Sequence, residues 1–211
     1  MIRIFIGTSP NGEDAKAEQA LEYSLRKNCD SELNIVWMKQ GNGDVFSGWN
    51  ISEWSTPFTM FRWIIPHCCN FSGRAIYMDV DQVNLRNIED LYNMEMTHPV
   101  HARFVKELKR HETSVMLMDC EKLQNILPSL DNLKSGAKVT LKADQIGYLD
   151  PRWNNLDGEG LSLNDIWHLH FTYMNSQPWE PSWNKNKKSK HRRQDLIDYW
   201  NKVYNESCTA R

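Results

Sequence analysis

The first 38 residues carry the pattern that most restricts how this chain can fold. Residues 2–7 (IRIFIG) form a β-branched run that ends at a glycine, and residues 33–38 (LNIVWM) form a second apolar run of strand length. Between the two runs, Ala17, Leu21 and Leu25 recur at helical spacing. A strand, a helix and a second strand in this order predict parallel pairing, because the helix returns the chain to the edge where the first strand began. The chain therefore opens as a parallel α/β sheet with flanking helices.

Further runs predict how this sheet continues. We expect more strands at residues 75–79, 101–105, 114–119 and 165–172. We expect helices at residues 56–69, 87–92, 120–127 and 194–204. In the helix at 56–69, Thr56 is the expected N-cap, Pro57 takes the first helical position, and Pro66 ends or kinks the helix.

Composition restricts the class of protein. With 211 residues, 40% hydrophobic and 25% charged, the chain is long enough for one substantial domain with its own core. A net charge of −2 argues against electrostatic binding of nucleic acid. Five cysteines without a CxxC pair indicate neither a disulfide framework nor a zinc site. No signal-peptide core and no apolar run of about 18 residues is present. We expect a soluble protein in the reducing cytoplasm.

A change in composition predicts where the main domain ends. Residues 184–193 (NKNKKSKHRR) form a basic run typical of a linker. The amphipathic helix expected at 194–204 follows it directly. We therefore expect a domain at residues 1–183 and a basic linker with a C-terminal helix at 184–211. Further domains of a longer polypeptide remain open.

Asp79 and Asp81 stand one residue apart where the strand expected at 75–79 ends. Residues two apart in a strand point to the same side, so the two carboxylates converge. Ligands of α/β sheets bind at the carboxyl ends of the strands, which is where this pair lies. Converging carboxylates repel each other unless a cation lies between them, and Mg²⁺ or Mn²⁺ in that place can also hold a diphosphate. The alternative is that both aspartates are turn residues.

Several common motifs are absent, and their absence leaves fewer kinds of reaction in which an ion bound there could take part. The chain has no GxxxxGK[ST] loop and no kinase signature set, which argues against the common phosphoryl-transfer sites. It has no GxGxxG either, so nicotinamide chemistry has no support. Glycosyl transfer from a nucleotide-sugar remains, because a metal can stabilise the charge on the departing diphosphate.

Three segments resemble motifs of the glycogenin-like retaining glycosyltransferases (family 8). AIYMDVDQVNLRNIEDLY (75–92) resembles the segment that carries the family's DxD motif. FTMFRWIIP (58–66) resembles a helix with a family arginine, here Arg62. HLHFTYMNSQPW (168–179) resembles the C-terminal motif whose histidine is the third metal ligand in the family, here His170.

The resemblance implies a fold, a reaction and a set of site residues. The fold would be GT-A, the Rossmann-like nucleotide-diphospho-sugar transferase fold, with a central mixed, mostly parallel sheet flanked by helices. The enzyme would move a hexose or deoxyhexose from a UDP-sugar to a glycan or glycoprotein acceptor, with retention. Mn²⁺ (or Mg²⁺) would be bound by Asp79, Asp81 and His170. The donor would lie against Gly7, Thr8, Asp79 and Trp179. KADQIGYLD (142–150) resembles the family's sugar-contacting segment, so the sugar would be placed by Arg62, Asp144 and Gln145.

The chain also departs from the family pattern. Gln177 stands where the family has a lysine near the donor phosphates, and the glycine after the His-Phe pair is absent. His168 lies two residues before His170 and competes with it as the metal ligand. A non-catalytic carbohydrate-binding or nucleotide-sugar-binding domain of the same fold is therefore the alternative. The short domain without a membrane anchor resembles the small glycosyltransferases of large algal viruses, for which the location would be the host cytoplasm.

Overall fold

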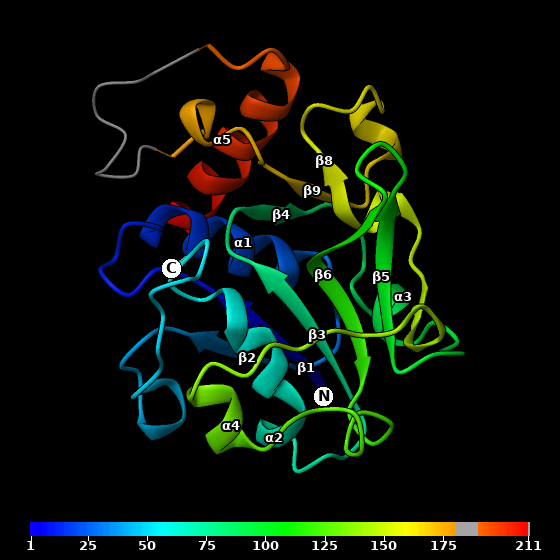
Figure 1. Ribbon diagram of the computed structural model, residues 1–211. Helices are drawn as coiled ribbons and strands as arrows, with labels where there is room; N and C mark the ends of the chain where they lie inside the picture. Colours follow the sequence, from blue (N-terminus) through cyan, green and yellow to red (C-terminus); the bar gives the residue numbers. More distant parts are fainter. Residues whose placement is uncertain (180–189, 211) are drawn as a thin grey trace. The chain divides into compact units, whose positions relative to one another are not determined.

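The computed structural model describes residues 1–179 and 190–210. Its contacts divide the chain into two compact units that interleave in sequence (Figure 1). The first unit comprises residues 1–11, 31–79 and 89–149. The second unit comprises residues 12–30, 80–88 and the part of the chain from 150 onward. Each unit contains one complete sheet.

The first unit is built on a six-stranded sheet with the order β2-β1-β3-β6-β5-β7. Its strands are β1 (Ile2–Gly7), β2 (Leu33–Met38), β3 (Arg74–Asp79), β5 (Val100–Val105), β6 (Arg110–Asp119) and β7 (Ile146–Tyr148). β1 pairs in parallel with both β2 and β3, and β7 pairs in parallel with β5, whereas β6 is antiparallel to both of its neighbours. The mixed, mostly parallel sheet expected from the sequence is confirmed.

Short helices and an aromatic cluster pack on this sheet. The helices are η1 (Asp44–Phe46), η2 (Thr59–Ile64), α2 (Ile65–Cys68), α3 (Glu89–Tyr92) and α4 (Leu130–Lys134). η2 contacts β1, α2 contacts β3, and α4 contacts η2. Phe46, Trp49, Trp54 and Phe61 meet edge to face with ring centroids 5.1–5.6 Å apart. Edge-to-face aromatic pairs stabilise a fold beyond the burial of their surface. This cluster therefore helps to hold η2, which contains Phe61, in the first unit.

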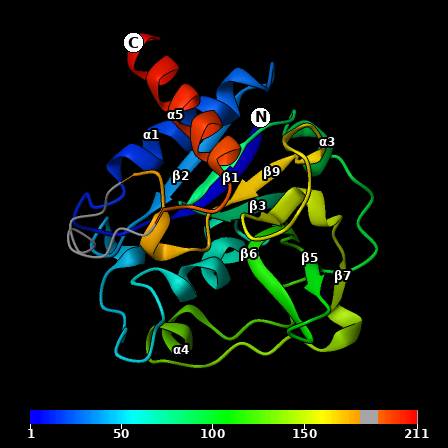
Figure 2. The same cartoon turned by 90° about the horizontal axis from the view of Figure 1, so that it is seen from above.

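The second unit combines a small sheet with two long helices. Its elements are α1 (Ala15–Lys27), β4 (Gln82–Asn84), η4 (Pro151–Asn154), β8 (Asn155–Leu156), η5 (Leu163–Asp165), β9 (His168–His170), η6 (Met174–Ser176) and α5 (Gln194–Thr209). The strand order is β4-β9-β8, with β9 antiparallel to β4 and parallel to β8. α1 packs against α5 and against β4, and Figure 2 shows the two helices side by side.

α5 is an integral part of the second unit. Leu196, Trp200 and Val203 recur at helical spacing and are buried. The Trp200 ring packs against Trp179, with centroids 5.7 Å apart, and stacks on Tyr204 at 5.3 Å. The helix expected at 194–204 is confirmed and extends to Thr209. The domain boundary expected at 183/184 lies outside the described residues and stays a prediction.

The helix expected at residues 56–69 differs from the structure. A 3₁₀-helix, η2, is followed by the single α-turn α2, and Pro66 lies in the first turn of α2 instead of ending a helix. Thr56 is not an N-cap, because the helical turn starts three residues later. Proline has no N–H, so the carbonyl four residues before Pro66 has no α-helical partner and the preceding turn tightens to i→i+3 bonding.

A second helix expected from the sequence is absent. Residues 120–127 form consecutive turns, held by bonds such as that from the Gln124 N–H to the Glu121 carbonyl at 3.2 Å. Pro128 follows and cannot supply the next helical N–H, and so short a stretch has too few bonds to offset the cost of helix nucleation. Leu123 holds residues 120–127 in place, because its side chain is buried in the core of the first unit.

The remaining predicted strands are confirmed, with shifted ends. β6 begins at Arg110, four residues earlier than expected, and β9 is shorter than the run at 165–172. Among residues 1–179 and 190–210, no helix is both long and apolar enough to cross a bilayer.

Trp200→Ala should lower the free energy of unfolding by about 3 kcal/mol, because it leaves a cavity in the second unit and removes contacts to the rings of Trp179 and Tyr204. Urea unfolding followed by circular dichroism measures this loss. Asn201→Ala is the matched control, since Asn201 is exposed on the same helix and should change stability by less than about 0.5 kcal/mol. Equal stability of Trp200→Ala and wild type would show that α5 is not needed to complete the core.

Candidate functional site

Asp79 ends β3 at the carboxyl edge of the parallel strands. It pairs in register with Gly7, the last residue of β1. Its Oδ1 accepts a hydrogen bond from the Tyr77 hydroxyl and lies 3.3 Å from Nη2 of Arg62. Tyr77 is two residues back on the same side of the strand. The charge of Asp79 therefore has a cation and a hydroxyl beside it within the first unit.

Arg62 is held rigidly in this position. Its Nε donates to the Thr59 carbonyl at 2.7 Å, and its Nη1 donates to both oxygens of Thr113 at 2.6 and 2.7 Å. The guanidinium also lies over the Tyr77 ring, 4.6 Å from its centroid. Its Nη2 lies 3.3 Å from Oδ1 of Asp79. A nearly buried arginine fixed by four partners keeps one positive charge at the end of β3.

Gly7 leaves room for this arrangement. A Cβ on Gly7 would lie 2.5 Å from Cδ2 of Phe58 and 2.8 Å from the Tyr77 hydroxyl. Thr8 is fully buried, and its N–H donates to the Met38 carbonyl at 3.3 Å. The turn after β1 is therefore closely packed against Tyr77. That Gly7 and Thr8 contact a nucleotide stays a prediction.

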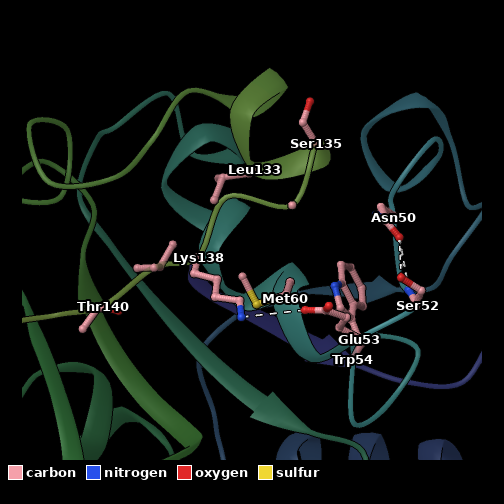
Figure 3. A pocket seen from close by; sticks show the side chains of 11 residues that line it. Asn50, Ser52, Glu53, Trp54, Met60, Leu133, Ser135, Lys138 and Thr140 are labelled. Carbon is pink, nitrogen blue, oxygen red and sulfur yellow. Dashed lines mark hydrogen bonds and ion pairs between the residues drawn. The ribbon is translucent and has the colours of Figure 1, made fainter.

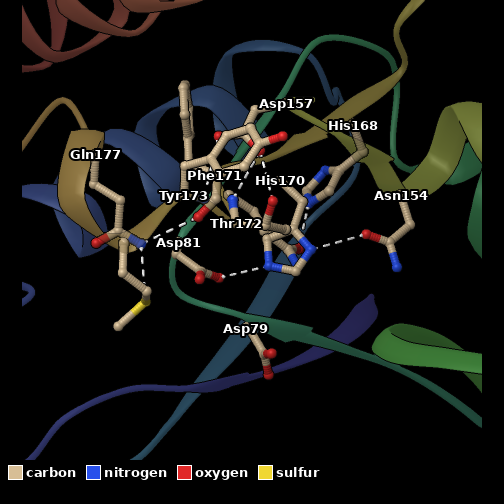
Figure 4. A network of polar contacts seen from close by, with 12 residues as sticks. Asp79, Asp81, Asn154, Asp157, His168, His170, Phe171, Thr172, Tyr173 and Gln177 are labelled. Carbon is tan, nitrogen blue, oxygen red and sulfur yellow. Dashed lines mark hydrogen bonds and ion pairs between the residues drawn. The ribbon is translucent and has the colours of Figure 1, made fainter. Parts of the chain in front are cut away.

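In the second unit, Asp81 faces His170 (Figure 4). The Phe171 N–H donates to the Asp81 carbonyl at 2.9 Å, which fixes the backbone of Asp81 beside the end of β9. The Nε2 of His170 lies 3.2 Å from Oδ1 of Asp81. Both side chains are largely buried, with 8% and 21% of their surface exposed. β9 thus places an imidazole nitrogen of His170 beside the carboxylate of Asp81.

The donors and acceptors around this pair suit a cation. The Nδ1 of His170 lies 3.2 Å from Oδ1 of Asn154, an amide oxygen that can only accept. Nδ1 therefore carries a proton, and in the neutral form of the ring the lone pair of Nε2 faces Asp81. Among the described residues, the buried Oδ1 of Asp81 has no hydrogen-bond donor. Two lone pairs that face each other in a buried place are stabilised by a positive ion, and nitrogen with carboxylate oxygen is a ligand set for Mn²⁺.

Asn154 was not identified from the sequence. It is fully buried at the end of η4, which packs against β9. No spacing links it to His170, because the two meet only through the packing of η4. A side chain that orients a ligating histidine through its second nitrogen is a regular feature of metal sites.

His168 has a different environment from His170. Its Nδ1 lies 3.2 Å from Oδ1 of Asn84 and its Nε2 lies 2.7 Å from Oε1 of Gln82. Burial lowers the pKa of His168 to about 3, so the ring is neutral at pH 7. Both ring nitrogens of His168 lie against side chains of β4, which favours a structural role for His168 and leaves His170 as the candidate ligand.

Trp179 and Gln177 lie in the packed part of the second unit. Only 2% of Trp179 is exposed, and its ring packs against Phe171 and Trp200. The Nε2 of Gln177 donates to the Phe171 carbonyl at 3.1 Å. This environment favours packing over a sugar contact for Trp179, whose predicted contact with the donor remains untested.

Asp144 and Gln145 lie far from Asp79 within the first unit. They belong to η3 (Ala143–Gln145), which immediately precedes β7. The ladders align the first residue of β7 with Val100, Val100 with Met118, and Met118 with Ala75 near the start of β3. Four residues of strand separate that level from Asp79, or about 13 Å, and β7 is three strands away, about 14 Å. The structure does not bring these two residues to the carboxyl edge.

A separate cavity of about 460 Å³ lies in the first unit (Figure 3). Trp54 and Met60 form its apolar wall, and the exposed ion pair between Lys138 and Glu53, 3.7 Å long, lies at its edge. None of the residues that the sequence indicated as functional lines it.

The chain matches no known protein-family model. It is similar to the protein CDI of Arabidopsis thaliana, with 22% identity over 86% of this chain and 80% of that protein. Among solved structures it is similar to the galactosyltransferase LgtC, with a TM-score of 0.62 at 10% identity, covering 97% of this chain and 96% of LgtC.

It is also similar to the glycosyltransferase GlyE of Streptococcus pneumoniae, with a TM-score of 0.62 and 14% identity; the match covers 98% of this chain but 63% of GlyE. At such identities the likeness shows the fold alone, and that fold is the GT-A fold that the sequence motifs implied.

Asp81→Asn should abolish most of the thermal stabilisation that Mn²⁺ gives the wild type, since it removes the charge that the ion would meet. An ion at 100 times its Kd adds about 2.7 kcal/mol to wild-type stability. In EDTA the variant should be at least as stable as wild type, because its new amide can donate to Nε2 of His170. Melting with and without Mn²⁺ measures both effects.

Asp165→Asn, which changes an exposed carboxylate of the second unit, is the control and should keep the full Mn²⁺ effect. An unchanged Mn²⁺ effect in Asp81→Asn would contradict the assignment of a cation to this pair.

Proposed function

We propose that this protein is a metal-dependent glycosyltransferase that uses a UDP-sugar donor. The observation that carries the proposal is the buried Asp81–His170 pair, in which a carboxylate oxygen without a hydrogen-bond donor faces an imidazole nitrogen. The GT-A fold and the similarity to glycosyltransferases support it. A fold alone does not determine a function, so the proposal rests on the site and takes the fold as context.

Asp79, Asp81 and His170 would hold Mn²⁺ or Mg²⁺. Asp81 and His170 offer two ligand atoms, and Val80 alone separates Asp79 from Asp81, so the two α-carbons lie within about 7 Å. When bound, the ion supplies positive charge to the departing nucleoside diphosphate. Asp81 is the more direct ligand, because Asp79 already contacts Arg62.

Other residues of the chain would orient this site. Asn154 keeps the proton of His170 on Nδ1, so that Nε2 remains a ligand. Arg62 holds the carboxylate of Asp79 and offsets part of its charge. The ring of His170 is itself largely buried, which limits its contact with water.

Finer features of the function rest on the resemblance to family 8. These are a hexose or deoxyhexose as the sugar, retention of configuration, a glycan or glycoprotein acceptor, and donor contacts by Gly7, Thr8 and Trp179. The role of Asp144 and Gln145 in placing the sugar has the same basis, and their position at the other end of the sheet does not add to it. A cytoplasmic location and an algal-virus source are likewise proposals.

The alternative function is binding of a nucleotide-sugar or carbohydrate without catalysis. The observation that favours it is Gln177, which offers no charge where the family has a lysine and whose Nε2 donates to a backbone carbonyl. The two functions separate in one assay, because only an enzyme releases UDP.

UDP should stabilise the wild type only when a divalent ion is present, because carboxylates and diphosphate repel each other without it. Incubation with a panel of UDP-sugars and Mn²⁺ should release UDP. Asp81→Asn should lower turnover by roughly a hundredfold, which corresponds to about 3 kcal/mol of lost transition-state stabilisation. Equal stabilisation by UDP in EDTA would rule out the metal.

His170→Ala should also lower turnover severely, since water can replace one ligand but does not hold its geometry. His168→Ala should reduce stability and leave the turnover of the folded protein nearly unchanged, because the ring nitrogens of His168 lie against Gln82 and Asn84. Circular dichroism is the folding control. Loss of turnover in His168→Ala with retention in His170→Ala would show that the ligand has been assigned to the wrong histidine.

A further inference from the structure

A second cavity, of about 360 Å³, lies beside the end of β9 in the second unit. Five of its lining residues are consecutive and begin two positions after His170; they are Thr172, Tyr173, Met174, Asn175 and Ser176. The other two are Lys190 and Arg192, which come from the basic segment before α5. The lining therefore joins hydroxyl and amide groups to two cations, and it includes no acidic side chain.

The buried side chain of Asp157 fixes the loop that forms one wall. The Thr172 N–H and hydroxyl donate to its Oδ1 at 3.1 and 2.6 Å, and the Tyr173 N–H donates to its Oδ2 at 3.4 Å. The Asp157 N–H donates to the His170 carbonyl at 3.0 Å. A Cβ on Gly158 would lie 2.5 Å from the Tyr173 hydroxyl, so glycine permits this close approach. Asp157 thus connects the loop at residues 172–176 to β9, the strand that carries the proposed metal ligand His170.

The same carboxylate holds residues 191–193 in place. The Nε2 of His191 lies 3.0 Å from Oδ2 of Asp157, and both side chains are almost completely buried. The Arg193 N–H donates to Nδ1 of His191 at 3.0 Å, so the proton of the ring is on Nε2. Arg193 itself donates to the Glu159 and Leu161 carbonyls at 2.9 and 3.0 Å. The anchored residues 191 and 193 alternate with Lys190 and Arg192, which are exposed at the cavity.

The charges of Lys190 and Arg192 are available to a ligand. Within residues 1–179 and 190–210, neither side chain forms an ion pair. Gln177, on the same loop, contributes no charge. Because a nucleoside diphosphate bound to one divalent ion keeps negative charge, further cations at its oxygens would strengthen its binding.

We propose that Lys190 and Arg192 bind the diphosphate of the donor, so that residues 190–193, which directly precede α5, are part of the donor site. This inference rests on the proposed function, because it names the residues that would hold the phosphates of the same donor. It gives His191 a positioning role, since the Asp157–His191 contact holds the two cations at the cavity.

The test is calorimetric titration of the full chain with UDP in the presence of Mn²⁺. The double variant Lys190→Gln/Arg192→Gln should bind UDP about tenfold more weakly than wild type, a loss of about 1.4 kcal/mol. Uridine, which has no phosphate, should bind both proteins equally. Lys202→Gln is the matched control, because Lys202 is an exposed cation of α5 outside the cavity. The difference in UDP affinity should shrink in 0.5 M salt, since exposed charges are screened.

Failure of this inference is distinguishable from failure of the proposed function. If wild type releases UDP with Mn²⁺ and the double variant binds UDP as tightly as wild type, the inference is overturned and the glycosyltransferase proposal stands. If wild type binds no UDP, inorganic pyrophosphate serves as the probe. Weaker pyrophosphate binding by the double variant would then support a phosphate site of Lys190 and Arg192, and equal or absent binding would overturn it.

Discussion

Two carboxylates that follow one strand are the constraint on which the rest of this site depends. Asp79 and Asp81 carry like charges one residue apart, and the structure treats them differently. Asp79 meets Arg62 and the Tyr77 hydroxyl, which together offset its charge within the first unit. Asp81 meets an imidazole nitrogen whose lone pair faces it. The charge of Asp79 is therefore offset within the first unit, whereas the buried Oδ1 of Asp81 has no hydrogen-bond donor among the described residues, and this difference is the basis of the proposed cation site.

The sequence predicted what short-range patterns determine. β1, α1, β2 and β3 follow from runs of apolar residues, and the DxD pair and His170 follow from motifs with fixed spacing. It did not predict Asn154 or the Asp157–His191 pair, because these contacts join residues far apart in the chain through η4, β8 and the segment before α5. Hydrogen-bonding side chains of this kind have no periodic signal. Their partners are set by how the elements pack.

Proline explains two elements that sequence patterns misjudged. Apolar spacing around Pro66 and before Pro128 is helical, but the missing N–H groups turn one stretch into a 3₁₀-helix and the other into turns. The 3₁₀ geometry of η2 matters for the site, because Arg62 projects from it to Thr113 and Asp79. Register explains a third difference. A resemblance between short segments carries no information about strand level, and the ladders place Gln145, three strands from β3, near the level at which β3 begins and not where it ends.

The order in which the second unit is assembled affects how the chain can be made. The face of α1 that packs against α5 is produced early, whereas α5 is synthesised only after the whole first unit. At roughly 5–20 residues per second, the ribosome would leave that face without its partner for on the order of ten seconds or more. During this time the first unit can pair its strands, while Gln19 and Lys27 of α1 lack their partners Ser207 and Glu206. Packing of α5 against α1 is therefore a slow step. A nascent chain that is completed in this order would benefit from a chaperone.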